Sequence, residues 1–243
     1  MGDSKPIIFQ FSFGESYMQD TVDYKGTFPP NFGSTLKKVD EMATVKVAWT
    51  AEEASDLLKR NPAPYAILIT DDGITESENR ELSFQVIEYV RNGGTAILCL
   101  CFGREVLNED FNSFMKDWDL PWKVHAYLWY DCVVNDSAVG LHGKQWMYGL
   151  PALYRSQSLF LGNVAPESCW YLPAPRIQEH DDDKRRKTAT LIRETPIAFT
   201  QVGEGYLGYT GDGNQHKATD AIMFAMLGMN QDVWWCTCGH EKK

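Results

Sequence analysis

The 243-residue sequence lacks any apolar run near the roughly 18–20 residues that a membrane-spanning helix needs. It also lacks an excess of positive charge, because 23 Lys and Arg against 33 Asp and Glu give a formal net charge of −10. That balance disfavours nucleic acid and anionic membrane surfaces as partners. We expect no secretion signal at the N-terminus, since Gln10 and Ser12 interrupt its apolar stretch and Asp3 replaces a basic start. We therefore expect a cytoplasmic protein.

The composition favours a folded domain with a sizeable core. Hydrophobic residues make up 44% of the chain and aromatic residues 13%, which excludes intrinsic disorder as the main interpretation. The length suits one domain spanning residues 1–243. Six cysteines are present, but Cys99 and Cys101 lie two apart in one predicted strand and the expected compartment is reducing. We expect all six to be free thiols.

Strands and helices alternate along the first half of the sequence, which favours a parallel sheet with helices on both faces. A Thr-x-x-Glu capping box at Thr75 and Glu78 predicts the start of the last helix in this half. The expected strands are 7–13, 44–49, 65–70 and 95–100, and the expected helices are 34–42, 50–60 and 75–91.

The second half differs in character. Residues 122–175 are rich in aromatic side chains without a helical period, and they predict irregular strands and loops. Residues 180–187 predict a charged loop, and 188–193 a strand. The fold class expected for the whole chain is α/β: a flavodoxin-like parallel sheet flanked by helices, with an antiparallel, aromatic-rich extension.

A hairpin and a final helix are predicted near the C-terminus. Strands at 197–202 and 206–210 flank Gly203 and Gly205, and an apolar helix is expected over 217–227. With Gly208, these glycines match the Gly-x-Gly-x-x-Gly string of dinucleotide sites. That motif needs a helix where residues 206–210 indicate a strand, so a hairpin turn is the better interpretation.

The segment that best indicates chemistry is 96–107. An apolar strand ends at Cys101, and Gly103 and an apolar helix pattern follow at once. A sharp strand-to-helix turn of this kind is the mechanical basis of a nucleophile elbow. The N-terminus of the helix would favour a thiolate at Cys101.

This segment resembles the elbow of the class I glutamine amidotransferase-like superfamily, as a divergent member. The resemblance implies Cys101 as nucleophile and the Phe102 amide as one oxyanion donor. The turn after residues 65–70 is similar to the one that supplies the second donor, which implies Gly73, although Asp71 and Asp72 stand beside it. Two acidic side chains there would oppose a developing negative charge.

The general base is the main departure from the superfamily, because the region 208–216 contains no His-x-Glu pair. Two substitutes are open. His216 follows the last strand, and Glu15 follows the first strand, where a related hydratase branch places a glutamate.

Two functions follow as expectations. The first is a cysteine-dependent hydrolase, amidase or lyase acting on a small molecule, with Cys101 as nucleophile, Glu15 or His216 moving the proton, and Phe102, Gly73 and Asp72 at the oxyanion or substrate. The alternative is a catalytically inactive binding or assembly protein that retains the fold. A homo-oligomer is possible in either case.

No cofactor and no metal are expected. Cys236, Cys238 and His240 offer three soft ligands near the C-terminus, but a structural zinc site needs four and no fourth is evident.

Overall fold

The structure is a computed structural model that describes residues 5–13, 30–60, 62–141, 149–174 and 194–229. Within these ranges no helix is both long and apolar enough to cross a membrane.

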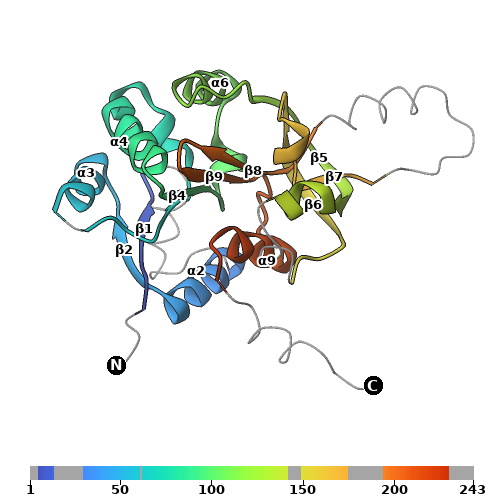
Figure 1. Cartoon of the computed structure of the whole chain (residues 1–243), viewed down its shortest axis with the longest axis horizontal. Helices are drawn as coiled ribbons and strands as arrows, with labels where there is room; N and C mark the ends of the chain where they lie inside the picture. The colour runs from blue at the N-terminus through green and yellow to red at the C-terminus, as the bar shows by residue number, and fades with distance from the viewer. Residues whose placement is uncertain (1–4, 14–29, 61, 142–148, 175–193, 230–243) are drawn as a thin grey trace, which may run out of the picture.

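A six-stranded sheet forms the centre of the protein (Figure 1). Its strand order is β2-β1-β3-β4-β9-β8, and the first five strands run parallel while β8 pairs antiparallel with β9. All of β3 and most of β4 are buried, as strands covered on both faces should be. The strands are β1 (Ile7–Phe11), β2 (Thr44–Ala48), β3 (Ala66–Ile69), β4 (Thr95–Leu98), β8 (Ile197–Val202) and β9 (Gly205–Thr210).

Helices cover both faces of this sheet. On one face lie α3 (Ala51–Arg60), α4 (Arg80–Arg91) and α6 (Asn108–Asp117), and on the other lie α2 (Pro30–Met42) and α9 (Lys217–Met226) (Figure 1). Each face has its own apolar core, one containing Leu82 and Val86 of α4 and the other Ile222 and Met223 of α9. This architecture confirms the predicted flavodoxin-like α/β class.

A second, three-stranded antiparallel sheet forms the extension, with the order β6-β5-β7. It consists of β5 (Lys123–Val134), β6 (Leu153–Gly162) and β7 (Tyr171–Pro173), with the short helix α7 (Asp136–Leu141) after β5. The two sheets meet where β6 reaches the end of β9: the Leu159 amide donates to the Gly211 carbonyl at 2.9 Å.

Most predicted elements are confirmed, but two details were wrong. The segment after β3 forms two 3-10 turns, η1 (Asp72–Thr75) and η2 (Ser77–Asn79), and α4 begins at Arg80. Thr75 is not the helix cap, because its hydroxyl donates to the Asp72 carbonyl at 2.7 Å. In the second half, where irregular strands and loops were predicted, β5 and β6 are long paired strands whose single register shift lies between Val124 and Ala126.

The hairpin at 203–205 is confirmed, since β8 and β9 pair in register on either side of it. Gly203 has a φ of +62°, and a side chain there would meet the backbone of Arg91. This turn therefore packs against the end of α4 and does not open a helix as a phosphate-binding loop would. The predicted loop 180–187 and strand 188–193 lie outside the described residues.

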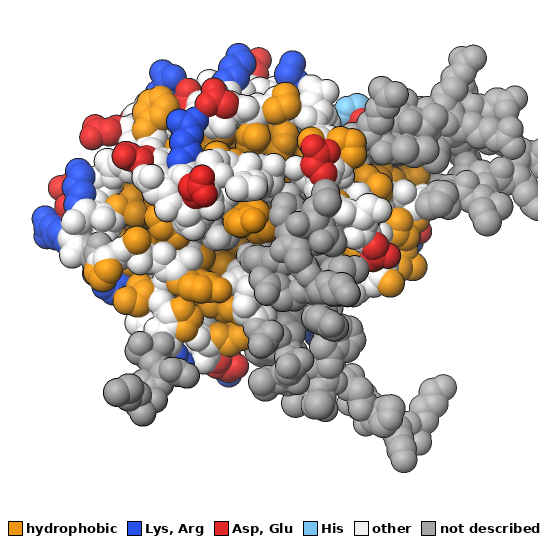
Figure 2. Space-filling model, in the orientation of Figure 1, with side chains coloured by type: hydrophobic (Ala, Val, Ile, Leu, Met, Phe, Trp, Pro, Cys, Tyr) orange, Lys and Arg blue, Asp and Glu red, His pale blue; other side chains and the backbone are white. Residues whose placement is uncertain are grey.

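On the face shown in Figure 2, acidic and basic side chains are mixed along the rim that carries α3 and α4. No continuous basic patch stands out among the described residues of that face.

Candidate functional site

The turn between β4 and the four-residue helix α5 (Phe102–Glu105) has the elbow shape that the sequence predicts. Its strained residue is Leu100, with a φ of +58°, whereas Cys101 has an ordinary helical conformation with φ −73° and ψ −19°. In a nucleophile elbow the nucleophile occupies the strained position. Here that position holds a leucine whose side chain is fully buried, and Cys101 follows it by one residue.

Cys101 is fully buried in the apolar core that contains Cys99 and Leu100. Burial is the largest cause that raises the pKa of its thiol far above the ordinary value, and the carboxylates of Glu105 and Asp71 raise it further. Arg104 opposes this effect only in part. A reactive cysteine needs an electropositive and partly exposed environment. The surroundings of Cys101 have the opposite character.

Three carboxyl groups lie near one another, and we call them the acidic group: Asp71, Asp72 and Glu105. Asp71 and Glu105 act on Cys101, and Asp72 acts on Glu105. Burial raises the pKa of Glu105 to about 7, and the charges of Asp71 and Asp72 add to the shift. Burial also raises the pKa of Asp72. Asp71 is 1% exposed and accepts a hydrogen bond from the Gly73 amide at 3.1 Å. The group thus sits where the fold would place an oxyanion, and it disfavours negative charge there.

Both amides predicted to hold an oxyanion are already hydrogen-bonded within the turns that carry them. The Phe102 amide donates to the Cys99 carbonyl at 3.1 Å, and the Gly73 amide donates to Asp71. Phe13 also crowds Gly73, because a Cβ at that glycine would lie 2.6 Å from the Phe13 Cβ. Neither amide is directed at an incoming carbonyl oxygen in this structure.

His216 stands at a different place, at the N-terminus of α9. Its Nδ1 lies 3.3 Å from Oδ2 of Asp212, a fully buried carboxylate that also accepts the His216 amide at 2.8 Å and the Thr219 hydroxyl at 2.5 Å. The other oxygen of Asp212 accepts the Asn214 amide at 3.0 Å. This set of bonds fixes the loop from β9 to α9 and orients the imidazole ring.

Aromatic side chains from β5 lie against the same loop. The Trp129 and His216 rings pack edge to face with centroids 5.9 Å apart, and the Tyr127 hydroxyl lies beside Gly213. Trp129 is 46% exposed and Tyr127 is 42% exposed, so part of each ring faces solvent. We call this the His216 cluster: Tyr127, Trp129, Asp212, Asn214 and His216.

Two further polar side chains border the His216 cluster. Gln157, opposite Trp129 in the β5–β6 pairing, accepts from the Asn214 side chain at 3.5 Å. Arg104 projects from α5 toward Gly213, and its charge acts on Tyr127, whose pKa is raised mainly by burial. The cluster and its border together therefore combine exposed aromatic surface with an imidazole, two amides and a guanidinium.

The structure thus separates the predicted site residues into two places. Cys101, Phe102, Gly73 and Asp72 belong with the acidic group at the ends of β3 and β4, whereas His216 contacts Asp212 and Trp129. Glu15 lies outside the described residues, as do the cysteines and histidine of the C-terminal tail. The described cysteines Cys99, Cys101, Cys132 and Cys169 are free thiols, as predicted.

Sequence reasoning missed the partners of both groups, although some signals were present. Glu105 stands four residues after Cys101, and Asp212 stands four residues before His216. The alternation of His125, Tyr127 and Trp129 with smaller apolar residues is the pattern of a half-exposed strand. Among the described residues no three His, Cys, Asp or Glu side chains gather in a way that could hold a metal ion.

No protein-family model matches this sequence, and no curated protein matches it either. Solved structures do share its fold. A ThuA-like protein from Bacteroides uniformis superposes with a TM-score of 0.57 at 10% identity, over 93% of this chain and 91% of that one. A ThuA-like protein from Parabacteroides merdae gives 0.55 at 11% identity, over 94% and 92%.

The mmIFT52 N-terminal domain also superposes, with a TM-score of 0.55 at 13% identity over 93% of this chain and 98% of that one. ThuA-like proteins belong to the glutamine amidotransferase-like class, so the predicted architecture is supported at the level of the fold. Identities this low carry no information on activity.

Proposed function

We propose that this protein binds a small polar molecule at the His216 cluster and does not use a cysteine nucleophile. The observation that carries the proposal is the elbow, where the strained position holds Leu100 and the adjacent Cys101 is buried beside carboxyl groups. Of the two expected functions, the binding protein that retains the fold is therefore the better supported.

The His216 cluster has the chemistry to recognise a ring-shaped polar molecule. Exposed faces of Trp129 and Tyr127 offer a surface on which a ring can stack. In the neutral imidazole tautomer whose Nδ1–H donates to Asp212, Nε2 of His216 carries the lone pair and can accept a hydrogen bond. The Asn214 and Gln157 side chains add donors and acceptors at the border. Ligand sites commonly combine apolar walls with a few polar groups of this kind.

Nuclear magnetic resonance with 15N-labelled protein tests this proposal. The probes are methyl glucoside, adenosine and asparagine, each titrated to about 10 mM, a range suited to weak, fragment-like binding of about 1 mM Kd. We expect at least one to shift the Trp129 indole signal and the Gly213 and Asn214 amide signals. Trp129→Ala should weaken that binding at least about fivefold, because stacking of this kind contributes about 1 kcal/mol or more.

Phe84→Ala is the matched control, since Phe84 on α4 is also 46% exposed but lies outside the cluster. It should leave the affinity unchanged. Shifts confined to the surroundings of Cys101 and Gly73, or equal effects of the two alanine variants, would contradict the proposal.

The cysteine-dependent hydrolase remains the rival, and one observation favours it: Cys101 stands at the N-cap of α5, three residues after the end of the parallel strand β4. Hydrolase activity would require a change of structure that exposes the Cys101 thiol and moves the neighbouring carboxyl groups away from it. The reactivity of the Cys101 thiol decides between the two functions.

A further inference from the structure

β2 is an edge strand of the central sheet, and β1 is its sole strand neighbour among the described residues. The other edge strand, β8, is partly covered, because Ala198 forms a bridge with Cys169. An uncovered edge presents unpaired backbone groups that another strand can bind.

The direction of the backbone groups along β2 follows from two hydrogen bonds. The Thr44 amide donates to the Pro6 carbonyl at 2.8 Å, and the Ala48 carbonyl accepts the Ser12 amide at 3.0 Å. Groups of alternate residues point to opposite sides of a strand, so those of Val45 and Val47 point away from β1. The Trp49 amide points the same way, and the Glu53 carboxylate accepts it at 2.7 Å.

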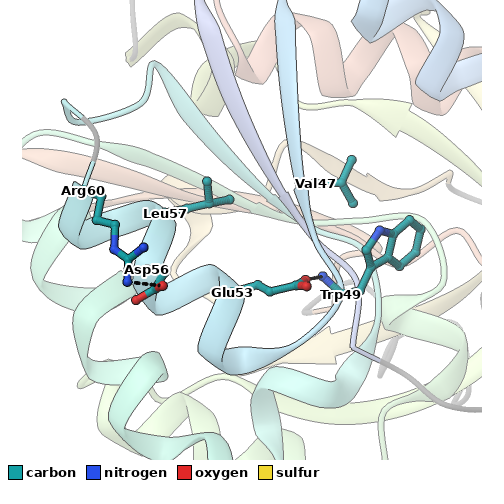
Figure 3. Close-up of a pocket in the computed structure, with 6 residues that line it drawn as sticks. All are labelled: Val47, Trp49, Glu53, Asp56, Leu57 and Arg60. Carbon is teal, nitrogen blue, oxygen red and sulfur yellow. Dashed lines mark hydrogen bonds and ion pairs between the residues drawn. The ribbon is translucent and has the colours of Figure 1, made fainter.

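A pocket of about 340 Å³ lies along this edge, between β2 and α3 (Figure 3). Val47, Trp49 and Leu57 supply its apolar lining, and Val47 is 38% exposed. Glu53, Asp56 and Arg60 line the rest, and Arg60 pairs with Asp56 at 2.7 Å.

The charges along α3 are complementary to those of a second α3 that runs antiparallel to it. Its first turn carries Glu52 and Glu53, and its last turn carries Lys59 and Arg60. All four side chains are exposed. In two such helices related by a two-fold axis, the acidic end of one faces the basic end of the other. An interface between identical copies must be self-complementary in this way.

We propose that the β2 edge is the interface of a homodimer, in which β2 of a second copy pairs antiparallel with it and α3 packs beside its counterpart. The two sheets then form one continuous sheet. The occupant is a second copy for two reasons. The acidic end of α3 faces the basic end of α3 in the other copy, and the exposed Val47 side chain packs against Val47 of that copy.

One register fits the edge best: Val47 lies opposite Val47 of the second copy. These two residues exchange both of their backbone hydrogen bonds, and each Val45 amide donates to the Trp49 carbonyl of the other copy. Lys46 then lies opposite Ala48, so two lysines do not face each other across the strands. The bond from the Trp49 amide to Glu53 stays intact.

Sedimentation velocity on the full chain between about 1 and 100 µM tests this interface, because dimers of standard interface size associate in or below this range. We expect a concentration-dependent shift from 28 kDa to twice that mass. Val47→Pro should keep the protein monomeric at every concentration. Proline is tolerated on an edge strand where its missing amide would face outward.

Charge-reversal variants of α3 test the same interface even where the proline variant fails to fold. Glu52→Lys and Lys59→Glu should each raise the dimer dissociation constant at least about fivefold, and the double variant should restore it to within twofold, because attraction replaces repulsion at both ends of the axis. Glu81→Lys, in the first turn of α4, is the matched control and should leave dimerisation unchanged.

A native chain that stays monomeric at 100 µM overturns the proposal. So does a dimer that the charge variants leave unaltered, or a double variant that is weaker than either single variant. None of these outcomes depends on a ligand at the His216 cluster, so the dimer and the proposed function stand or fall separately.

Discussion

Replacing Gly211 with alanine is expected to lower the free energy of unfolding by about 3 kcal/mol, as overpacking and a broken backbone hydrogen bond together would. A Cβ at this position would overlap the carbonyl oxygen of Leu159 and lie 2.9 Å from the Tyr209 hydroxyl. Neither neighbour can move freely, because the Leu159 amide is bonded to the Gly211 carbonyl and the Tyr209 hydroxyl to the Leu159 carbonyl.

Urea unfolding of Gly211→Ala measures this loss, and Gly213→Ala is its matched control two residues away. A Cβ at Gly213 would meet the end of the Tyr127 side chain, which can swing aside, and the Arg104 Cβ at 3.1 Å, which needs to shift only slightly. We therefore expect a loss of less than about 1 kcal/mol there. Equal stabilities for the two variants would mean that the β6–β9 junction does not fix the position of the loop that carries Asp212 and His216.

The second large effect concerns Glu105 and pH. Burial raises its pKa in the folded protein from an ordinary value of 4.5 to about 7. Between these pH values the folded state therefore holds a proton that the unfolded chain has released. The contribution of Glu105 to the free energy of unfolding must fall as pH rises from about 4.5 to 7, and it levels off above that.

Glu105→Gln removes this contribution, so the difference in unfolding free energy between variant and native protein should change by about 1–2 kcal/mol between pH 4.5 and pH 8. The full shift would give more, but Glu105 as a whole is only half-buried, so nearby water screens part of the effect. Glu194, whose pKa burial also raises to about 7, titrates in both proteins and cancels from the comparison. A difference that stays constant with pH would place Glu105 in a more solvated setting and remove one reason for the inert state of Cys101.

The central sheet could be predicted from the sequence because its strands are short and mostly apolar, β3 and β4 above all, and strong breakers bound them. The same holds for the hairpin at Gly203 and for α9. The start of α4 could not be fixed, because the capping pattern at Thr75 and Glu78 competes with the 3-10 turns that the Asp71 side chain supports through its bond to Gly73.

The site was harder to predict than the fold for two physical reasons. First, a shift of one residue along the elbow decides whether the strained position holds Leu100 or Cys101, and a pattern of apolar residues does not fix a turn that closely. Second, the environment of Cys101 comes from Asp71 on another element, and the orientation of His216 depends on Trp129, which lies 87 positions earlier in the chain. Such contacts follow from tertiary packing alone.

The reactivity of the Cys101 thiol tests the central claim most directly. In a Cys99→Ala variant, Cys101 is the one cysteine of its tryptic peptide, so iodoacetamide labelling can be followed by mass spectrometry in native and urea-unfolded protein. We predict that native Cys101 labels at least about 100-fold more slowly than the unfolded chain at pH 8, because labelling needs local opening of a buried thiol with a raised pKa. Native labelling at pH 6 that outpaces the unfolded chain would reveal an activated thiolate and contradict the account.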